Sequence, residues 1–222
     1  MLSPDLSYLQ RIRARTDPAS LLREPQFLEA QKLFFTVIHE LGWTVDFDLA
    51  DMREVHAVAA LGEKVQDARV LDIGCGSTEA YVLGNSFRDL YPPYFAEMLT
   101  KLGAHVTGID IRENPEASYD HRVLDSTKGD WTATLEPPYD LVLGLSLFNA
   151  PESAYEKSRE RCDELMRDMH GLLADDGLLI VTLRDEMFAD ASKAHTKTES
   201  YLNAHEYSLL HLDLNTAWAK KS

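Results

Sequence analysis

From residue 69 onward, short apolar runs alternate with helical stretches, and this alternation constrains the fold more than any other feature of the chain. Such a pattern is typical of a parallel sheet whose strands are joined by crossover helices. The expected strands cover residues 69–73, 105–109, 120–124, 139–145 and 177–183, and helices are expected near 93–102 and 153–173. The pattern therefore predicts an α/β fold.

The two ends of the chain complete this prediction. Residues 207–214 and 217–221 are interpreted as an antiparallel hairpin that closes the sheet. Residues 3–62 are expected to be helical because their apolar residues recur at three- and four-residue spacing. Gly42 is expected to end the longest of these helices, and a third helix is expected over 49–61. We therefore predict a Rossmann-like, doubly wound, mostly parallel seven-stranded sheet with an antiparallel C-terminal hairpin. An N-terminal helical cap over 1–64 is expected to precede the sheet domain over 65–222.

Composition argues against several classes of partner. Lys and Arg number 22 against 37 Asp and Glu, so the net charge is −15, which repels a nucleic-acid backbone. No stretch approaches the roughly 18 apolar residues that a membrane span needs. The two cysteines, Cys75 and Cys162, are expected to be reduced, and no cluster of metal ligands is visible. We expect a cytoplasmic protein without nucleic-acid or membrane partners.

The segment VLDIGCGSTE, residues 70–79, reads as a strand followed by a glycine loop and the start of a helix. Glycines after a strand allow the backbone to approach a ligand closely, and the helix N-terminus offers free N–H groups. In a dinucleotide-binding loop, the position of Glu79 requires a small residue. The loop therefore indicates a nucleotide-like ligand but disfavours a nicotinamide dehydrogenase.

Acidic side chains lie at the ends of three successive expected strands. Asp72 precedes Gly74 by two residues, Asp110 ends the second strand, and Asp125 follows the third. A carboxylate has two oxygens and no donor, so Asp110 is suited to accept hydrogen bonds from both ribose hydroxyls. Asp125 is suited to accept one from an exocyclic amine such as that of adenine.

This order of features resembles the class I S-adenosylmethionine-dependent methyltransferases over about residues 69–183. The resemblance implies S-adenosylmethionine as cofactor, a first-motif loop around its methionine part, a ribose-binding acid, and apolar and polar contacts to its adenine. The cofactor-binding residues that it implies are Asp72, Gly74, Cys75, Gly76, Asp110, Ile111, Asp125, Ser126 and Leu145. Ile111 is expected beside the adenine, Asp125 and Ser126 at its edge, and Leu145 facing the cofactor.

The chain departs from the family pattern in two places. The segment between Gly76 and Asp110 is longer than one crossover helix needs, and we expect residues 81–93 to form an ordered loop at the mouth of the cofactor site. After the fourth strand, Ala150 and Glu152 replace the first proline and the aromatic residue of the motif that amino-methylating members carry. This difference argues against a nucleobase amino group as acceptor.

The family implies an in-line displacement that moves the sulfonium methyl group to an acceptor. The sulfonium already activates the methyl group, so the protein mainly aligns the partners and excludes water. No catalytic residue is assigned from the sequence. A small-molecule acceptor is favoured, and a protein acceptor stays open. The alternative from another class is a non-catalytic module that binds S-adenosylmethionine as a sensor or scaffold.

Overall fold

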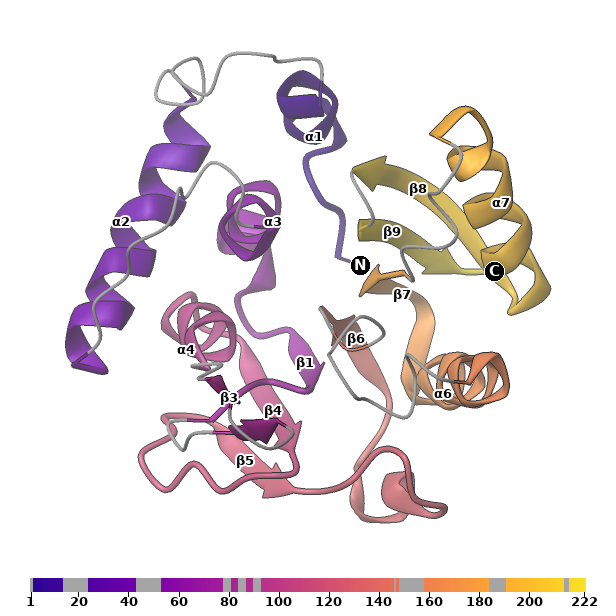
Figure 1. Ribbon diagram of the computed structural model, residues 1–222. Coiled ribbons are helices and arrows are strands. Elements are labelled where there is room, and N and C mark those ends of the chain that lie inside the picture. The colour runs from indigo at the N-terminus through magenta and orange to yellow at the C-terminus, as the bar shows by residue number, and fades with distance from the viewer. Residues whose placement is uncertain are drawn as a thin grey trace.

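The computed structural model describes residues 2–13, 24–42, 53–77, 81–83, 87–89, 93–145, 147, 158–183, 191–213 and 216–222. A central sheet separates two layers of helices (Figure 1). Helices α1, α3 and α4 lie on one face, with α2 packed outside α3 and α4, and the opposite face packs against α6 and α7. Within the described ranges, no helix is long and apolar enough to cross a membrane.

The sheet has seven strands in the order β5-β4-β1-β6-β7-β9-β8. Their bounds are β1 Arg69–Ile73, β4 His105–Asp110, β5 Asp120–Val123, β6 Tyr139–Gly144, β7 Leu173–Thr182, β8 Tyr207–Asp213 and β9 Thr216–Lys221. The first five in spatial order are parallel, and β9 pairs antiparallel with both β7 and β8. The predicted sheet with its C-terminal hairpin is therefore confirmed.

The order of the strands also marks the place where a ligand is expected in such a fold. From β1 the chain moves outward to β4 and β5, and it then returns to pair β6 with the other side of β1. In open α/β sheets, ligands bind at the carboxyl ends of the strands beside such a reversal. The glycine loop leaves β1 at this point.

The N-terminal helices are α1 Leu6–Arg13, α2 Pro25–Glu40 and α3 Arg53–Leu61, followed by the short 3-10 helix η3 Gly62–Val65. Helix α2 ends next to Gly42, whose φ of 70° gives the left-handed turn expected there. Phe34 of α2 and Val58 of α3 share one apolar core with Val70 of β1 and Leu141 of β6. The cap and the sheet are thus packed together, and the division near residue 64 stays a prediction.

The helices after β1 are α4 Tyr94–Lys101, the 3-10 helix η4 Trp131–Thr134, α6 Arg159–Leu172 and α7 Ala191–Ala204. The predictions for α4 and α6 are confirmed where the structure describes them. Helix α7 was not expected from the sequence. Its inward positions are Ala194, Thr198 and Leu202, and only one of these is large and apolar.

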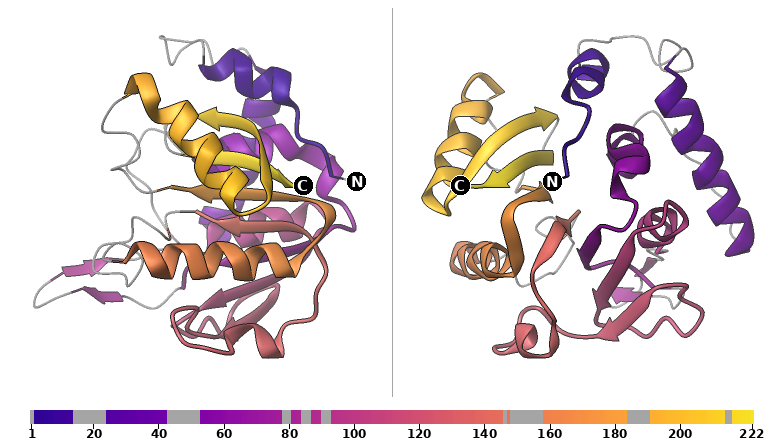
Figure 2. Two further views of the ribbon diagram at one scale, coloured as in Figure 1. Left: turned by 90° about the vertical axis from the view of Figure 1, so that its right-hand side faces the viewer. Right: turned by 180° about the vertical axis from the view of Figure 1, so that it is seen from behind.

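Two further differences concern strands. Strand β7 begins earlier than expected because Leu173 pairs with Tyr139, and an irregular stretch precedes the regular pairing from Leu178. Within the expected loop 81–93, β2 Tyr81–Leu83 and β3 Phe87–Asp89 form an antiparallel pair. This pair extends from the edge where the parallel strands end (Figure 2, left). Its position at the mouth of a cofactor site stays a prediction, and residues 84–86 and 90–92 lie outside the described part.

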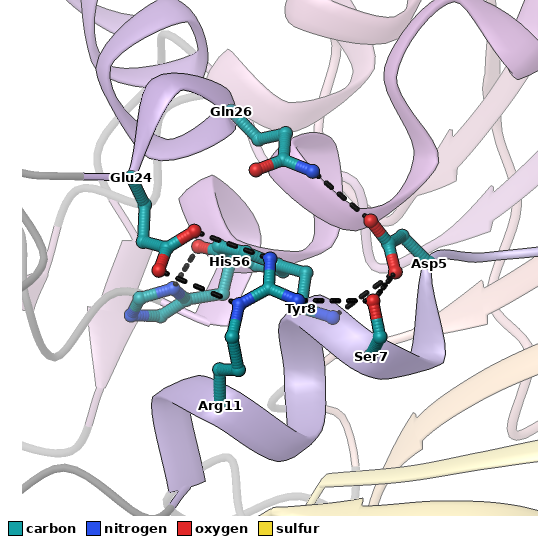
Figure 3. A network of polar contacts seen from close by, with 7 residues as sticks. All are labelled: Asp5, Ser7, Tyr8, Arg11, Glu24, Gln26 and His56. Carbon is teal, nitrogen blue, oxygen red and sulfur yellow. Dashed lines mark hydrogen bonds and ion pairs between the residues drawn. The ribbon is translucent and has the colours of Figure 1, made fainter.

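A polar network joins the three N-terminal helices (Figure 3). The fully buried Tyr8 of α1 shares a hydrogen bond of 2.8 Å with Nδ1 of His56 on α3. The His56 ring also stacks on Phe27 of α2, with 5.3 Å between centroids. One imidazole therefore contacts a residue of each neighbouring helix.

Charged groups at the edge of the same network add further contacts between α1 and the start of α2. Arg11 of α1 lies 3.2 Å from a carboxylate oxygen of the buried Glu24, which precedes α2. Gln26 donates to Asp5 over 3.0 Å. Buried charges are tolerated when they are paired, so these contacts fix the start of α2 against α1.

Replacing Tyr8 with Phe is expected to lower the free energy of unfolding by about 0.5–1.5 kcal/mol, because it removes one buried hydrogen bond and keeps the ring. Urea denaturation of both proteins measures the difference. The denaturant slope should stay unchanged, since the same surface is exposed on unfolding. Equal stability of the two proteins would contradict a role of the Tyr8–His56 bond in holding the cap.

Candidate functional site

The glycine loop after β1 is held against the end of β4 by backbone hydrogen bonds. The N–H groups of Gly74 and Cys75 both donate to the carbonyl oxygen of Ile109, over 2.8 Å and 3.1 Å. Gly74 and Gly76 have φ values of 73° and 91°, a left-handed conformation that side-chain-bearing residues avoid. The two glycines are therefore required for the loop to turn across the carboxyl ends of β1 and β4.

Asp110, the last residue of β4, ties this loop from the other side. One of its carboxylate oxygens accepts from the Gly76 N–H and the other from the Arg112 N–H, each over 3.1 Å. The residue is 7% exposed. A carboxylate has two oxygens and no donor of its own, so Asp110 acts here as an acceptor on both oxygens. The predicted ribose acid and the predicted loop are thus brought into direct contact.

Cys75 lies under the loop and not in an accessible position. Its Sγ lies 3.5 Å from the Tyr119 hydroxyl and 3.7 Å from Nδ1 of His121. Burial, together with the nearby Asp72 carboxylate, raises the pKa of the thiol. A thiol that resists ionisation is a poor nucleophile, so Cys75 packs the loop and does not perform covalent chemistry.

Gly108 of β4 provides the space for this packing. A Cβ atom there would lie 2.4 Å from the Tyr119 ring and 2.9 Å from the Cys75 Sγ. Both distances are shorter than side chains tolerate, so the loop and the Tyr119 ring need a glycine at this position.

Apolar side chains lie beside the polar loop. Ile111 follows β4 and is 57% exposed, and Val123, which pairs with Asp110 across the sheet, is 51% exposed. Leu145 is buried directly after β6. The Leu147 side chain lies against the glycine loop, 3.4 Å from where a Cβ of Gly74 would be. Ile111 and Leu145 were expected from the sequence, whereas Val123 and Leu147 were not.

Asp125 and Ser126 lie in the turn after β5. The Asp125 carboxylate accepts from the backbone and the hydroxyl of Thr127, over 3.0 Å and 2.6 Å, and pairs with Lys128 over 3.1 Å. Burial alone would raise the pKa of Asp125, but these partners hold it below its usual value. The carboxylate is therefore ionised and fixed, and a contact with adenine stays a prediction for both residues.

Asp72 is a strongly perturbed acid of the site. It is 4% exposed, and burial, with the charges of Glu54 and Asp110 nearby, raises its pKa to about 8. Burial also raises the pKa of Glu54, in the first turn of α3, and that of the Tyr94 hydroxyl at the start of α4. Arg53, next to Glu54, donates to the Thr182 hydroxyl over 3.0 Å. Shifted acids in a crevice are candidates for function.

Sequence reasoning missed Arg53 and Glu54 because they precede the recognised motifs and belong to the cap. The Tyr94 ring packs edge-on against Phe34, with 5.3 Å between centroids. Glu79 and Asn149 lie outside the described residues. In the described part of the chain, no three metal-binding side chains gather in one place.

No family model matches the chain, and no curated protein matches it in sequence. Solved structures do match. A 1,6-didemethyltoxoflavin N1-methyltransferase of Burkholderia thailandensis, with bound 1,6-didemethyltoxoflavin and S-adenosylhomocysteine, is 13% identical over 100% of this chain and 92% of that chain, with a TM-score of 0.50. The magnesium protoporphyrin IX methyltransferase of Synechocystis PCC 6803, with bound S-adenosylmethionine, is 14% identical over 100% and 93%, with a TM-score of 0.46. A ribosomal-protein methylase of Lactobacillus delbrueckii subsp. bulgaricus is 17% identical over 87% and 78%, with a TM-score of 0.44.

At these identities the comparison concerns the fold alone. The structural similarity to the Burkholderia enzyme and the strand order of the sheet indicate the same fold. The chain has the Rossmann-like fold of the class I S-adenosylmethionine-dependent methyltransferases, as the sequence predicted.

The packing under the loop can be tested with Gly108→Ala. The added methyl group overlaps the Tyr119 ring and the Cys75 Sγ, so we expect a loss of about 1–3 kcal/mol in the free energy of unfolding. Gly171→Ala is a suitable control, because a Cβ there meets nothing within 4 Å. Denaturation of the three proteins measures the effect. Equal losses in both variants would contradict the packing described for Gly108.

The raised pKa of Asp72 predicts a pH-dependent stability. Between its ordinary value of 3.8 and about 8, the folded protein keeps a proton that the unfolded chain loses. The free energy of unfolding should therefore fall as pH rises through this window. Asp72→Asn has no titrating group at this position, so its free energy of unfolding should not fall in this way. By pH 8.5 it should exceed that of the wild type by a few kcal/mol, as an order of magnitude.

Denaturation at pH 4 and pH 8.5 tests this expectation. Near pH 4 the two proteins should differ little, because the wild-type carboxyl is then protonated in the folded state and about half protonated in the unfolded chain. Parallel pH profiles of the two proteins would show that Asp72 is ionised in the folded state at both pH values.

Proposed function

We propose that this protein is an S-adenosylmethionine-dependent methyltransferase and that its acceptor is a small molecule. The observation that carries the proposal is the left-handed glycine loop bound to the Asp110 carboxylate at the carboxyl ends of β1 and β4. This loop lies at the reversal of strand order, where α/β folds bind nucleotide-like ligands.

The residues present fit such a ligand. The glycines leave no side chain between the loop backbone and a methionine chain, and the Asp110 carboxylate is the kind of acceptor that ribose hydroxyls need. Ile111 and Val123 offer an exposed apolar surface to an adenine ring, and burying it would favour binding. Asp125 and Ser126 at the adenine edge, and Leu145 facing the cofactor, belong to the same proposal.

When bound, S-adenosylmethionine supplies a sulfonium-activated methyl group that an acceptor displaces in line. The residues of the chain then have to align the acceptor and exclude water. The cap helices and α4 are suited to this, since they pack on the face of the sheet toward which Asp72 points. The net charge of −15 favours a small molecule over a nucleic acid.

Calorimetric titration with S-adenosylmethionine, S-adenosylhomocysteine and NAD tests the cofactor. The first two should bind in the micromolar range and NAD should not. Asp110→Asn should weaken both by about 10- to 100-fold, because it replaces charge-assisted hydrogen bonds with neutral ones. Asp175→Asn is the matched control, since that carboxylate is exposed at the other end of the sheet. Equal binding by Asp110→Asn and the wild type would overturn the proposed site.

Catalysis is tested by the product. With S-adenosylmethionine and the small-molecule fraction of a cell extract, S-adenosylhomocysteine should accumulate faster than without extract, and mass spectrometry should find a compound heavier by one methyl group. Formation with the protein fraction only would favour a protein acceptor. Binding without product formation in either fraction would favour a sensor or scaffold.

A further inference from the structure

The first turn of α3 lies at the same edge of the sheet as the glycine loop. Helix α3 runs from Arg53 to Leu61, and η3 then leads to the start of β1, so α3 is antiparallel to that strand. Its beginning is therefore near the carboxyl end of the sheet. The hydrogen bond of 3.0 Å from Arg53 to Thr182, the last residue of β7, fixes it there.

Asp72 points toward this helix. Side chains alternate along a strand, and Leu71 and Ile73 belong to the core under α6, whereas Val70 belongs to the core shared with α3 and α4. Asp72 thus lies on the α3 and α4 side. It is 4% exposed, and in the described part of the chain no hydrogen bond reaches its carboxylate. A buried carboxylate without a partner is costly to ionise.

Among the described residues, the charged and titratable groups around Asp72 do not balance it. Glu54 of α3 and Asp110 of β4 add negative charge, and the Tyr94 hydroxyl of α4 is neutral. Arg53 is the cation that acts on Glu54, and its guanidinium is bound to Thr182. Within the described part of the chain, two acids from different elements, Glu54 and Asp72, therefore have too little positive charge beside them. We call them the acid pair.

A ligand with positive charge would complete this arrangement, because an opposite charge favours the ionised form of both acids. Resting on the function proposed above, we propose that the acid pair makes the site select the positively charged sulfonium of S-adenosylmethionine over the uncharged thioether of its product. Glu54 is the new element of this selection, since it comes from the N-terminal cap and not from the glycine-loop motif.

Methyl transfer would remove the positive charge that the acid pair attracts. The bond between the methyl carbon and sulfur breaks, its electron pair stays on sulfur, and the carbon binds the acceptor. The sulfur thereby loses its positive charge, so the attraction of the acid pair is reduced when the product forms. In the same way, binding of the cation at neutral pH should release to solvent a proton that the acid pair held.

The test compares S-adenosylmethionine and S-adenosylhomocysteine by calorimetry, with the wild type, Glu54→Gln and Glu160→Gln. Glu160 is the matched control, because it also lies in the first turn of a helix but is exposed on the opposite layer. Titrations at pH 7 in buffers of different ionisation enthalpy give the number of protons released. The wild type should prefer S-adenosylmethionine and release more protons with it than with S-adenosylhomocysteine.

Glu54→Gln should reduce the ratio of the two affinities by roughly 10-fold, the size expected for one unit charge acting through several ångströms of protein. It should also reduce proton release, while Glu160→Gln should change neither. Asp72→Asn provides a second variant and should reduce the ratio as well. In the wild type, the ratio should grow between pH 6 and pH 9 as the acid pair ionises.

An unchanged ratio and unchanged proton release in Glu54→Gln would overturn the inference and leave the methyltransferase proposal standing. Equal weakening of both ligands would do the same, because it would assign Glu54 a purely structural role. Failure of the wild type to bind either ligand would instead overturn the proposed function and, with it, the inference.

Discussion

The hydrogen bond from the Gly76 N–H to the Asp110 carboxylate is the contact on which the rest of the site depends. It joins the loop after β1 to the end of β4, and the second oxygen of Asp110 is fixed by the Arg112 N–H. With both oxygens oriented, the loop cannot shift without breaking a charge-assisted bond inside the protein, where such bonds are strong. The described part of the loop is therefore held against β4 without a ligand.

The acids of the site differ in how well their negative charge is compensated, because they have different hydrogen-bond partners. Asp110 and Asp125 accept hydrogen bonds from N–H or O–H groups. The Asp72 carboxylate is buried and accepts none within the described residues, and Glu54 is half-buried with a negative charge that acts on it. Replacing an uncompensated buried acid with an apolar residue would ordinarily favour folding. Asp72 is easiest to understand as a group whose charge is used by a ligand, at some cost to the stability of the empty protein.

Much of the fold could be predicted, because strands buried on both faces leave continuous apolar runs in the sequence. Helix α7 could not, since Ala194 and Thr198 give its inward side almost no apolar signal. The glycine loop and Asp110 could be predicted because motif and chemistry are local. The proximity of Glu54 to Asp72 could not, because it depends on the direction in which α3 packs against β1.

Helix α3 is buried on nearly all sides, with Val55, Val58 and Leu61 among its core residues. It is also fixed at both ends, by Arg53 on Thr182 and by the Asp5 N–H on the Ala60 carbonyl. The cap is therefore not an exchangeable module. A replacement of the N-terminal helices would change the charge beside the glycine loop and, in the same step, the packing of the sheet. Ligand specificity and folding therefore depend on the same helices in this chain.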